Sequence, residues 1–178
     1  MDIQPLHSMK EFQDMIFISE ILLQAKIANR ASERLEATKT SFDKVEVWCS
    51  IQSILVAAGN VSKILWPVSK YKMRGERLRH FLNVGENNIL SDRKFRNVFF
   101  EHYDERVEEW FQNQNGGVYI DLAMNPSLSG GLGGNEHRGY NSFDNSLMFR
   151  GERLDLNKVV NALSELHNIC KLYVLDIV

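Results

Sequence analysis

Residues Ser91–Gln114 read SDRKFRNVFFEHYDERVEEWFQNQ, a stretch with a clean helical pattern. At about 100° per residue, the apolar side chains fall on one side of a helix and the glutamates on the other. His102 lies inside the apolar sector beside Phe95 and Phe99, and Arg96 lies at its other margin, roughly 120° away. We therefore predict one amphipathic helix with an arginine and a histidine flanking its packing face.

The sequence before this stretch predicts three helices. Apolar spacing favours a long helix over residues 8–38. A second helix begins at Ser41 as its N-cap and ends at Trp66-Pro67, because a residue before proline avoids the helical region. A short helix follows within residues 70–84. The second helix is apolar nearly all round, so we place it at the centre of the fold.

The sequence after the stretch changes character. Residues 118–124 and 146–149 have strand composition and predict a small β-hairpin. The glycine-rich residues 125–145 between them predict a loop. A last helix follows, capped by Asp155 or Asn157.

Length and composition predict one well-buried core. With 178 residues and 44% apolar content, nothing in the chain requires a second domain. We predict an all-α fold, an antiparallel bundle of four to five helices in a single domain over residues 1–178. A small β-hairpin and the Gly-rich loop are inserted at residues 116–156, before the last helix. The net charge of −2 and pI near 6.2 argue against a protein that coats nucleic acid by charge alone.

The two cysteines, Cys49 and Cys170, both fall in apolar helical patterns. We therefore expect buried free thiols and a reducing compartment. The N-terminal residues lack a secretory pattern, and the longest apolar runs are far shorter than the about 20 residues that span a membrane. We expect a cytoplasmic protein without membrane contact.

The one basic cluster of the sequence lies at residues 70–80, KYKMRGERLRH. Lys72, Arg74 and Arg77 are candidate substrate-binding residues, because a strip of cations can contact RNA phosphates. A solvated helix face carries the same kind of charge. Both interpretations stay open from the sequence.

Three other patterns do not support a site. Gly130–Gly134 is rich in glycine, but no Lys-Ser/Thr follows it and no helix opens from it, so it does not predict a phosphate loop. Glu136-His137 has no second His or Cys at ligand spacing, so we predict no metal site. The glutamates of Ser91–Gln114 lie on the polar face, where solvated charge is the ordinary explanation.

The sequence around Arg96 and His102 resembles a known family signature. Residues 96–102, RNVFFEH, are similar to the motif of the HEPN superfamily (higher eukaryotes and prokaryotes nucleotide-binding), in which an arginine and a polar residue are followed a few residues later by a histidine. The surroundings over residues 54–111, including LWP at 65–67 and RGERLR at 74–79, resemble small bacterial single-domain HEPN proteins.

This resemblance implies an all-α bundle and, for many members, a metal-independent ribonuclease whose active site forms where two copies pair. Arg96 and His102 are about 9 Å apart along one helix and would not converge alone. Two such helices at a twofold interface can pool two arginines and two histidines. We therefore expect a homodimer that pairs through the Ser91–Gln114 helix.

The expected chemistry is attack of an RNA 2′-hydroxyl on the adjacent phosphate. His102 is the candidate acid/base and Arg96 the phosphate clamp. By the same resemblance, Asn97 would orient the site, and Tyr103 is a further candidate substrate contact. Because the RNA supplies the attacking hydroxyl, neither a metal nor a nucleotide cofactor is required.

The resemblance also bears on partners. In HEPN toxins paired with a nucleotidyltransferase antitoxin, a tyrosine two positions after the histidine can be modified, whereas this chain has Asp104 there. That difference argues against antitoxin control of this kind. An antitoxin partner, and a role as a toxin or a stress or phage-defence effector, remain hypotheses. The alternatives are a non-catalytic HEPN module that binds a nucleotide, RNA or protein, and a structural helical protein in which Arg96 and His102 only pack.

Overall fold

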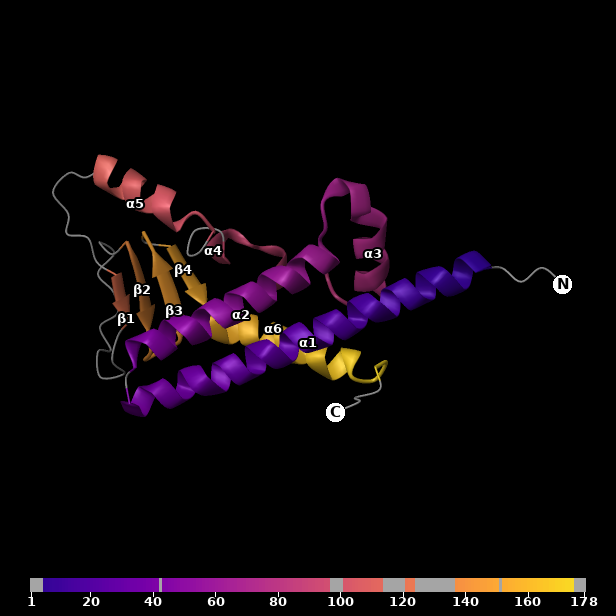
Figure 1. Cartoon of the computed structure of the whole chain (residues 1–178), viewed down its shortest axis with the longest axis horizontal. Helices are drawn as coiled ribbons and strands as arrows, with labels where there is room; N and C mark the ends of the chain where they lie inside the picture. Colours follow the sequence, from indigo (N-terminus) through magenta and orange to yellow (C-terminus); the bar gives the residue numbers. More distant parts are fainter. Residues whose placement is uncertain are drawn as a thin grey trace.

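The computed structural model describes residues 5–41, 43–96, 101–113, 121–123, 137–150 and 152–174. Two long helices lie side by side, a third packs against them, and a small sheet lies at one end (Figure 1). The chain is thus mainly helical with a small sheet before its last helix, as the sequence predicts. The long helices are α1 (Pro5–Ser41) and α2 (Lys44–Leu65), and the third is α6 (Leu156–Cys170).

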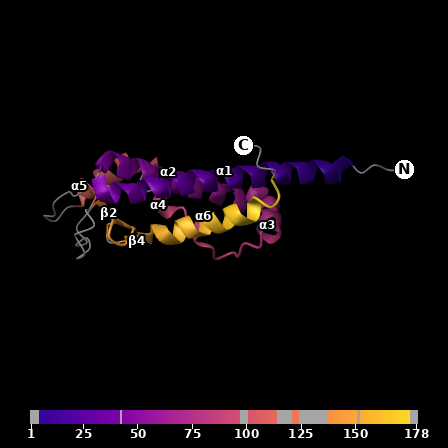
Figure 2. The same cartoon turned by 90° about the horizontal axis from the view of Figure 1, so that it is seen from below.

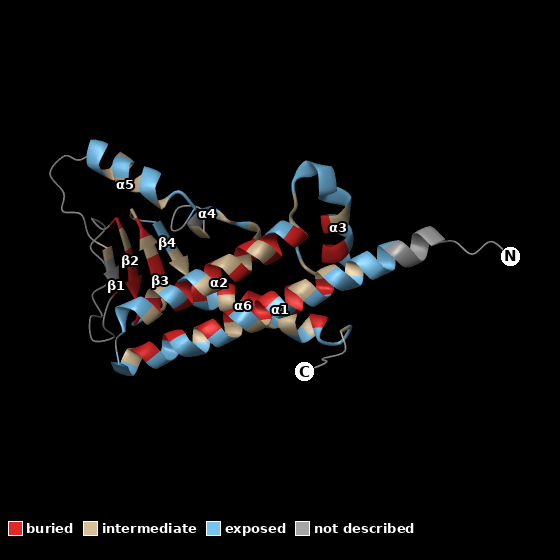
Figure 3. Ribbon diagram, viewed as in Figure 1, coloured by how far each residue is buried: buried red, intermediate tan, exposed pale blue. Residues whose placement is uncertain are grey.

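Apolar residues at helical spacing form the core between these three helices. Ile21 of α1, Ile51 of α2 and Leu163 of α6 are all 0% exposed. Buried residues recur along all three helices (Figure 3), and the view from below places α6 on one side of the α1–α2 pair (Figure 2). Full burial of an aliphatic side chain contributes about 1.5–3 kcal/mol. This interface therefore dominates the stability of the fold.

Helix α2 begins at a side-chain cap. Asp43 has an extended backbone (φ −83°, ψ 106°), and its carboxylate accepts hydrogen bonds from the N–H groups of Val45 (2.9 Å) and Glu46 (3.2 Å). The predicted cap at Ser41 is wrong, because Ser41 is the last residue of α1. A carboxylate satisfies two free N–H groups and also complements the positive end of the helix, so Asp43 is the stronger cap.

The far end of α2 stops before Pro67, as predicted. A 3-10 turn, η1 (Ser69–Tyr71), leads into α3 (Lys72–Phe81). Gly75 allows α3 to pack closely here, since a Cβ atom at this position would lie 2.4 Å from Pro67 Cδ and 2.6 Å from the Leu65 carbonyl oxygen. A larger residue would push α3 away from the end of α2.

The prediction of one continuous helix over Ser91–Gln114 is wrong. The structure has a 3-10 turn, η2 (Ile89–Ser91), a short helix, α4 (Lys94–Arg96), and a longer helix, α5 (Tyr103–Gln112). The backbone bends at His102, which has φ −127° and ψ 33° and precedes α5. The two candidate residues therefore do not share one straight helix.

Local hydrogen bonds form the separate turn before α4, and weak packing leaves α5 out of line with α4. Asn88 accepts a hydrogen bond from the Leu90 N–H (2.9 Å), and Asp92 accepts one from the Lys94 N–H (2.8 Å). Such side-chain bonds compete with a regular helix. Moreover, α5 has no buried residue, so no helix-to-helix interface holds it in line with α4. Residues 97–100 lie outside the described part of the chain.

Within the described residues, four short strands form the sheet, in the order β1-β2-β3-β4. Strand β1 pairs with β2 in parallel, and the other two pairs are antiparallel. The strands are β1 (Asp121–Ala123), β2 (Arg138–Asn141), β3 (Ser146–Phe149) and β4 (Glu152–Asp155).

The predicted hairpin joined the wrong strands. Strands β1 and β3 fall within the predicted segments 118–124 and 146–149, but β2 lies between them in a region predicted to be loop. The turn between β2 and β3 is tight because the Asn141 side chain accepts from the Phe143 N–H (2.9 Å) and Asn145 adopts a left-handed φ of 57°. The arginine, glycine and asparagine of β2 gave no strand signal.

Asp155 caps α6, as predicted, by accepting a hydrogen bond from the Asn157 N–H (2.9 Å). Cys170 near the end of this helix is buried, and burial raises the pKa of its thiol to about 12. Cys49, by contrast, is exposed, so the prediction of a buried thiol there is wrong. It lies at helical spacing from the exposed Val45 and Gln52, on a solvent-facing side of α2.

Within the described ranges, no single helix is long and apolar enough to cross a membrane. One bent pair, α2 with Ser69–Phe81, meets those criteria of length and composition only when the two parts are taken together.

Candidate functional site

Arg96 ends α4, and its side chain lies against α2. It is 13% exposed, and its Nη2 donates a hydrogen bond to Glu101 Oε1 at 2.5 Å. Gly59 of α2 makes room for it, since a Cβ atom there would lie 2.3 Å from Arg96 Cδ and 2.6 Å from Nη1. Nη1 is buried and has no hydrogen-bond partner among the residues that the structure describes. One side of the guanidinium is therefore held by Glu101, and the other is buried against α2 with hydrogen-bonding capacity left unused.

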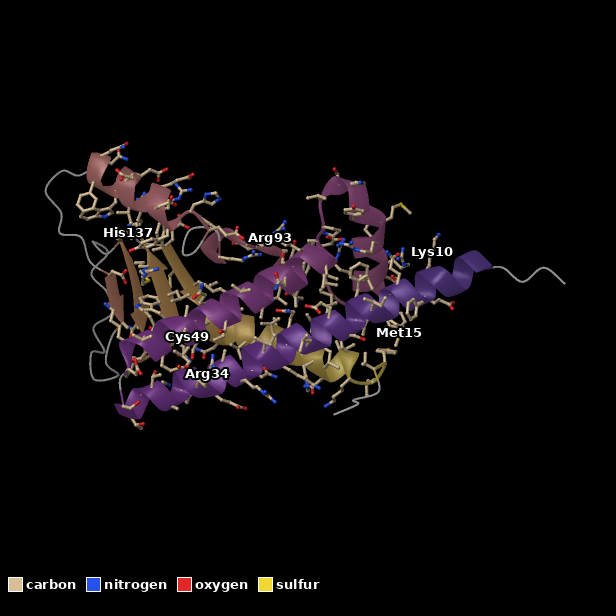
Figure 4. All side chains as sticks on the ribbon, in the orientation of Figure 1. Lys10, Met15, Arg34, Cys49, Arg93 and His137 are labelled. Carbon is tan, nitrogen blue, oxygen red and sulfur yellow. The ribbon has the colours of Figure 1, made fainter. Side chains whose placement is uncertain are left out.

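A cavity of about 40 Å³ lies beside this guanidinium. Asp92, Arg93 and Arg96 form its polar side, and Figure 4 shows Arg93 beside α4. Its remaining lining is apolar or small and comes from α2, η2, β4 and α6: Leu55, Ala58, Gly59, Ile89, Leu90, Leu154 and Val159. Four separate parts of the chain thus meet at Arg96.

His102 stands at the bend before α5. Its side chain is 49% exposed, and its Nδ1 lies 3.3 Å from Glu105 Oε2. The prediction that His102 lies within the apolar packing sector is wrong, because the bend takes it out of the helix on which that sector was drawn. An accessible imidazole can exchange protons with a bound ligand.

Glu101 connects the two candidate residues. It immediately precedes His102 in the chain and forms the ion pair with Arg96. The segment therefore presents a histidine open to solvent and an arginine held by the neighbouring carboxylate. Asn97 lies outside the described residues, and its role stays a prediction, as does the pooling of two such pairs at a twofold interface.

Two arginines of the basic strip on α3 are held by other protein groups. Arg77 donates two hydrogen bonds of 2.7 Å to the Asp14 carboxylate, which raise the pKa of Arg77. Arg74 donates to the Lys63 carbonyl oxygen (3.2 Å), and its guanidinium carbon lies 4.5 Å from the centre of the Phe17 ring. Both residues tie α3 to the long helices.

The third residue of that strip, Lys72, remains 72% exposed, with the Glu76 carboxylate 3.5 Å away. None of the three strip residues lines the cavity at Arg96. Their contact with RNA stays a prediction, and it would require Arg74 and Arg77 to exchange protein partners for phosphate.

Tyr103 contacts the sheet rather than the cavity. Its hydroxyl lies 3.3 Å from Asp121 Oδ2, and the same oxygen accepts from Nε of Arg138 at 2.9 Å. The Arg138 guanidinium lies over the Tyr103 ring (4.4 Å to the centroid) and the Trp48 ring (4.6 Å). These cation–π contacts join α5, α2 and the sheet. The described position of Tyr103 is therefore structural, and its role as a substrate contact stays a prediction.

His137 is buried in the same cluster, between α5 and the sheet (Figure 4). Its ring makes edge contacts with the rings of Tyr103 (5.7 Å) and Phe149 (5.2 Å). Burial, and to a lesser extent the positive charges of Arg150 and Arg138, lower the pKa of His137 to about 4, while the negative charge of Asp121 opposes them. The imidazole is therefore neutral at pH 7 and acts there as a packed ring.

Sequence reasoning missed the cluster of Tyr103, Asp121, His137 and Arg138. Its members come from α5, β1 and the start of β2, and no local spacing connects them. The sequence pattern around His137 suggests no role besides metal binding, and no group of three or more His, Cys, Asp or Glu side chains in the described part of the chain is arranged to hold a metal ion. The cluster was recognisable only once the strand order was known.

Comparison of the chain with protein-family models, with curated proteins and with solved structures yields no match in any of the three. The HEPN resemblance therefore rests on the motif RNVFFEH at residues 96–102 and its surroundings.

Proposed function

We propose that the chain is a metal-independent HEPN endoribonuclease that acts as a homodimer, in the role of a toxin or a stress or phage-defence effector. The observation that carries this proposal is the bend before α5. It leaves the His102 imidazole half exposed, while the Nη1 of Arg96 has no hydrogen-bond partner among the described residues. A proton-exchanging group and a cationic donor thus lie on one short segment.

The reaction is an internal transesterification. His102 removes the proton of an RNA 2′-hydroxyl, whose oxygen then attacks the adjacent phosphorus. The bond from phosphorus to the 5′-oxygen breaks, the leaving oxygen takes up a proton, and the products are a 2′,3′-cyclic phosphate and a 5′-hydroxyl. Arg96 stabilises the charge on the phosphate oxygens after its guanidinium leaves Glu101 and turns out of its buried position over Gly59.

Pairing of two chains supplies the second acid/base. The first His102 accepts the proton of the 2′-hydroxyl, on one side of the phosphorus, and is not placed to protonate the leaving oxygen on the other side in the same step. The His102 of the second copy protonates that oxygen. On α5, Phe111 is 60% exposed and offers an apolar anchor for this pairing. Asp104, Glu105 and Glu108 are exposed on the same helix, and their charges place them at the rim of such an interface.

A second candidate function is a non-catalytic HEPN module that binds a nucleotide, RNA or a protein partner. The ion pair between Arg96 and Glu101 favours this non-catalytic function. The Arg96 side chain is only 13% exposed and must leave the Glu101 carboxylate before it can bind a phosphate fully. This function predicts binding that persists without turnover.

The products of the wild-type protein distinguish the two candidates. Single-stranded RNA and DNA of one sequence are incubated with the protein in excess EDTA, and product ends are analysed by mass spectrometry. The ribonuclease is expected to leave 2′,3′-cyclic phosphates on RNA and to leave DNA intact. Loss of RNA cleavage on chelation, or equal cleavage of DNA, contradicts this chemistry. Binding of RNA without any cleavage supports the non-catalytic module instead.

A further inference from the structure

Helix α1 carries a stripe of exposed apolar residues, which we call the α1 stripe. At about 100° per residue, its five members fall within one sector of about 120° on the helical wheel. They are Phe12 (70% exposed), Met15 (38%), Ile16 (53%), Leu23 (51%) and Ile27 (38%). Single exposed apolar residues are ordinary, but a continuous stripe marks a surface that binds something.

The opposite side of α1 packs against α2 and α6. Ile18, Ile21 and Ala25 are at most 1% exposed, and they lie on the half of the helical wheel opposite the α1 stripe. Figure 3 shows that α1 runs past the end of α2, with exposed residues along this part of the helix. The packing of the core therefore does not account for the apolar character of the stripe.

A groove runs along the α1 stripe and contains little polar surface. Four stripe residues line it together with Phe17, Ser19, Glu20 and, from α2, Ile64. Ser19 lies at the middle of the stripe, and its small side chain allows a second helix to approach closely there. Its hydroxyl donates to the Met15 carbonyl oxygen (2.9 Å), so a helix that covers Ser19 leaves this group hydrogen-bonded.

The distribution of charge along α1 favours a second copy of the same chain as the partner. Residues 11–20 contain three carboxylates and no Lys or Arg, whereas residues 21–30 contain two cations and no Asp or Glu. One of the carboxylates, Asp14, is paired with Arg77 of α3. In an antiparallel pair of α1 helices, the acidic half of each copy lies beside the basic half of the other.

The size of the α1 stripe fits a dimer interface. Its exposed fractions together equal about two and a half whole residues. This corresponds to roughly 450 Å² of mostly apolar surface, if one large side chain offers about 180 Å². A standard interface buries about 800 Å² on each partner, a little more than half of it apolar. The stripe therefore supplies the apolar part of one such interface.

We propose that two copies of this chain pair through their α1 stripes, with the two helices antiparallel and the twofold axis close to Ser19. Ile16 of each copy then lies against Leu23 of the other copy. Phe12 lies against Ile27 in the same way. Such a contact is isologous, because each copy contributes the same surface.

This contact is separate from the pairing proposed at α5. The α1 stripe faces away from α2, and α5 lies beyond α2 (Figure 1), so pairing of the stripes does not bring two His102 side chains together. The inference therefore goes beyond the proposed ribonuclease and does not depend on it. A chain that pairs at both surfaces forms an assembly larger than a dimer.

The test compares the masses of two charge variants with that of the wild-type chain by sedimentation velocity, at chain concentrations up to about 100 µM. Ile16→Glu/Leu23→Glu introduces two charges at the centre of the α1 stripe. Val45→Glu/Met73→Glu introduces the same charges at exposed apolar positions outside the stripe and is the matched control. All four side chains are exposed, so neither variant removes a core residue.

The wild-type chain and the control variant are expected to form the same assembly, a dimer of twice 20.6 kDa if only the stripes pair. In the stripe variant, the dissociation constant of this contact should rise by about 100-fold or more, because unpaired carboxylates would be buried in the interface. The variant is then a monomer, or a dimer if α5 also pairs. The mass is measured without RNA, so a failure of the ribonuclease function leaves this result unchanged.

Chemical cross-linking tests the orientation of the two helices. In a Cys49→Ser background, in which the remaining Cys170 is buried, Ser19→Cys should form a covalent dimer with a short bismaleimide. Arg30→Cys should not, because the two copies of this position lie about 30 Å apart in the antiparallel pair. In a parallel pair they would lie side by side.

A wild-type chain that stays monomeric overturns the inference and assigns the stripe to a different partner. Equal masses of the stripe and control variants also overturn it, because any pairing would then use another surface. Cross-linking of Arg30→Cys as readily as Ser19→Cys contradicts the antiparallel arrangement.

Discussion

The α1–α2–α6 bundle and the α4–α5 segment are built by different forces. In the bundle, fully buried aliphatic side chains such as Ile21 and Ile51 define which faces meet. Helix α5 has no buried residue, and Figure 3 shows it exposed or intermediate along its length. Similar helical periodicity in the sequence therefore gives different structures. The helices of the bundle form the core, whereas α5 lies over the sheet and buries no residue.

Polar contacts hold the α4–α5 segment to the rest of the molecule. Glu109 on α5 accepts from Arg106 (2.7 Å) and lies 3.4 Å from Nη1 of Arg150, which also donates from Nη2 to the Arg106 carbonyl oxygen. The hydrogen bond from Arg106 lowers the pKa of Glu109. Contacts of this kind at the surface are individually weak. The comparison teaches that the bundle is the scaffold and that the segment carrying His102 can shift without unfolding it.

The largest expected effect is in the bundle. Ile51→Ala removes a side chain that is 0% exposed, and it should lower the free energy of unfolding by about 4 kcal/mol, since it deletes buried methyl groups and leaves a cavity. Val45→Ala in the same helix, at a residue 77% exposed, should change it by less than about 0.5 kcal/mol. Urea denaturation measures both. Equal costs for the two variants would mean that α2 is not the core helix.

An intermediate effect is expected where α5 meets the sheet. The pKa of His137 is about 4 in the folded protein and about 6.5 in the unfolded chain, so the unfolded chain binds more protons between these values. Stability is thus fully present above about pH 6.5 and falls as the pH drops toward 4, by at most about 3 kcal/mol from this residue. Arg138, Arg150, Asp121 and Tyr103 surround the ring.

Unfolding free energies at several pH values between 4 and 7 test this expectation. His137→Phe keeps an aromatic ring in the cluster and should lose this part of the pH dependence, whereas His80→Ala, at an exposed position, should retain it. An unchanged pH dependence in His137→Phe would show that the imidazole does not stay neutral and buried.

The contrast also explains what could be predicted from the sequence. The long helices α1, α2 and α6 were predictable because their apolar residues recur at helical spacing and face one another. Pro67 and Asp155 marked their boundaries by local chemistry. The break at His102 was not predictable in this way, because α5 packs no buried residue that would hold it in line with α4.

The candidate site was predictable in part. Its motif was visible in the sequence, but the placement of Arg96 over Gly59 and the ion pair with Glu101 depend on how α2 and α4 meet. Leu55 and Val159 are also far apart in the chain, and only the fold brings them to the cavity beside Arg96. Long-range polar contacts carry no periodic signal.

The smallest expected effect on stability comes from the residue on which the function depends. Because its side chain is 49% exposed, His102→Ala should change the free energy of unfolding by less than about 0.5 kcal/mol. The variant thus separates catalysis from folding, and His80→Ala, another exposed histidine, serves as its matched control.

The rate of RNA cleavage by His102→Ala in EDTA, beside wild type and His80→Ala, is the most direct test. Removing an acid/base catalyst costs about 100-fold or more in rate. We expect such a loss for His102→Ala and wild-type rates for His80→Ala, with both variants folded. Cleavage by His102→Ala at the wild-type rate would contradict the assignment of this histidine as the acid/base.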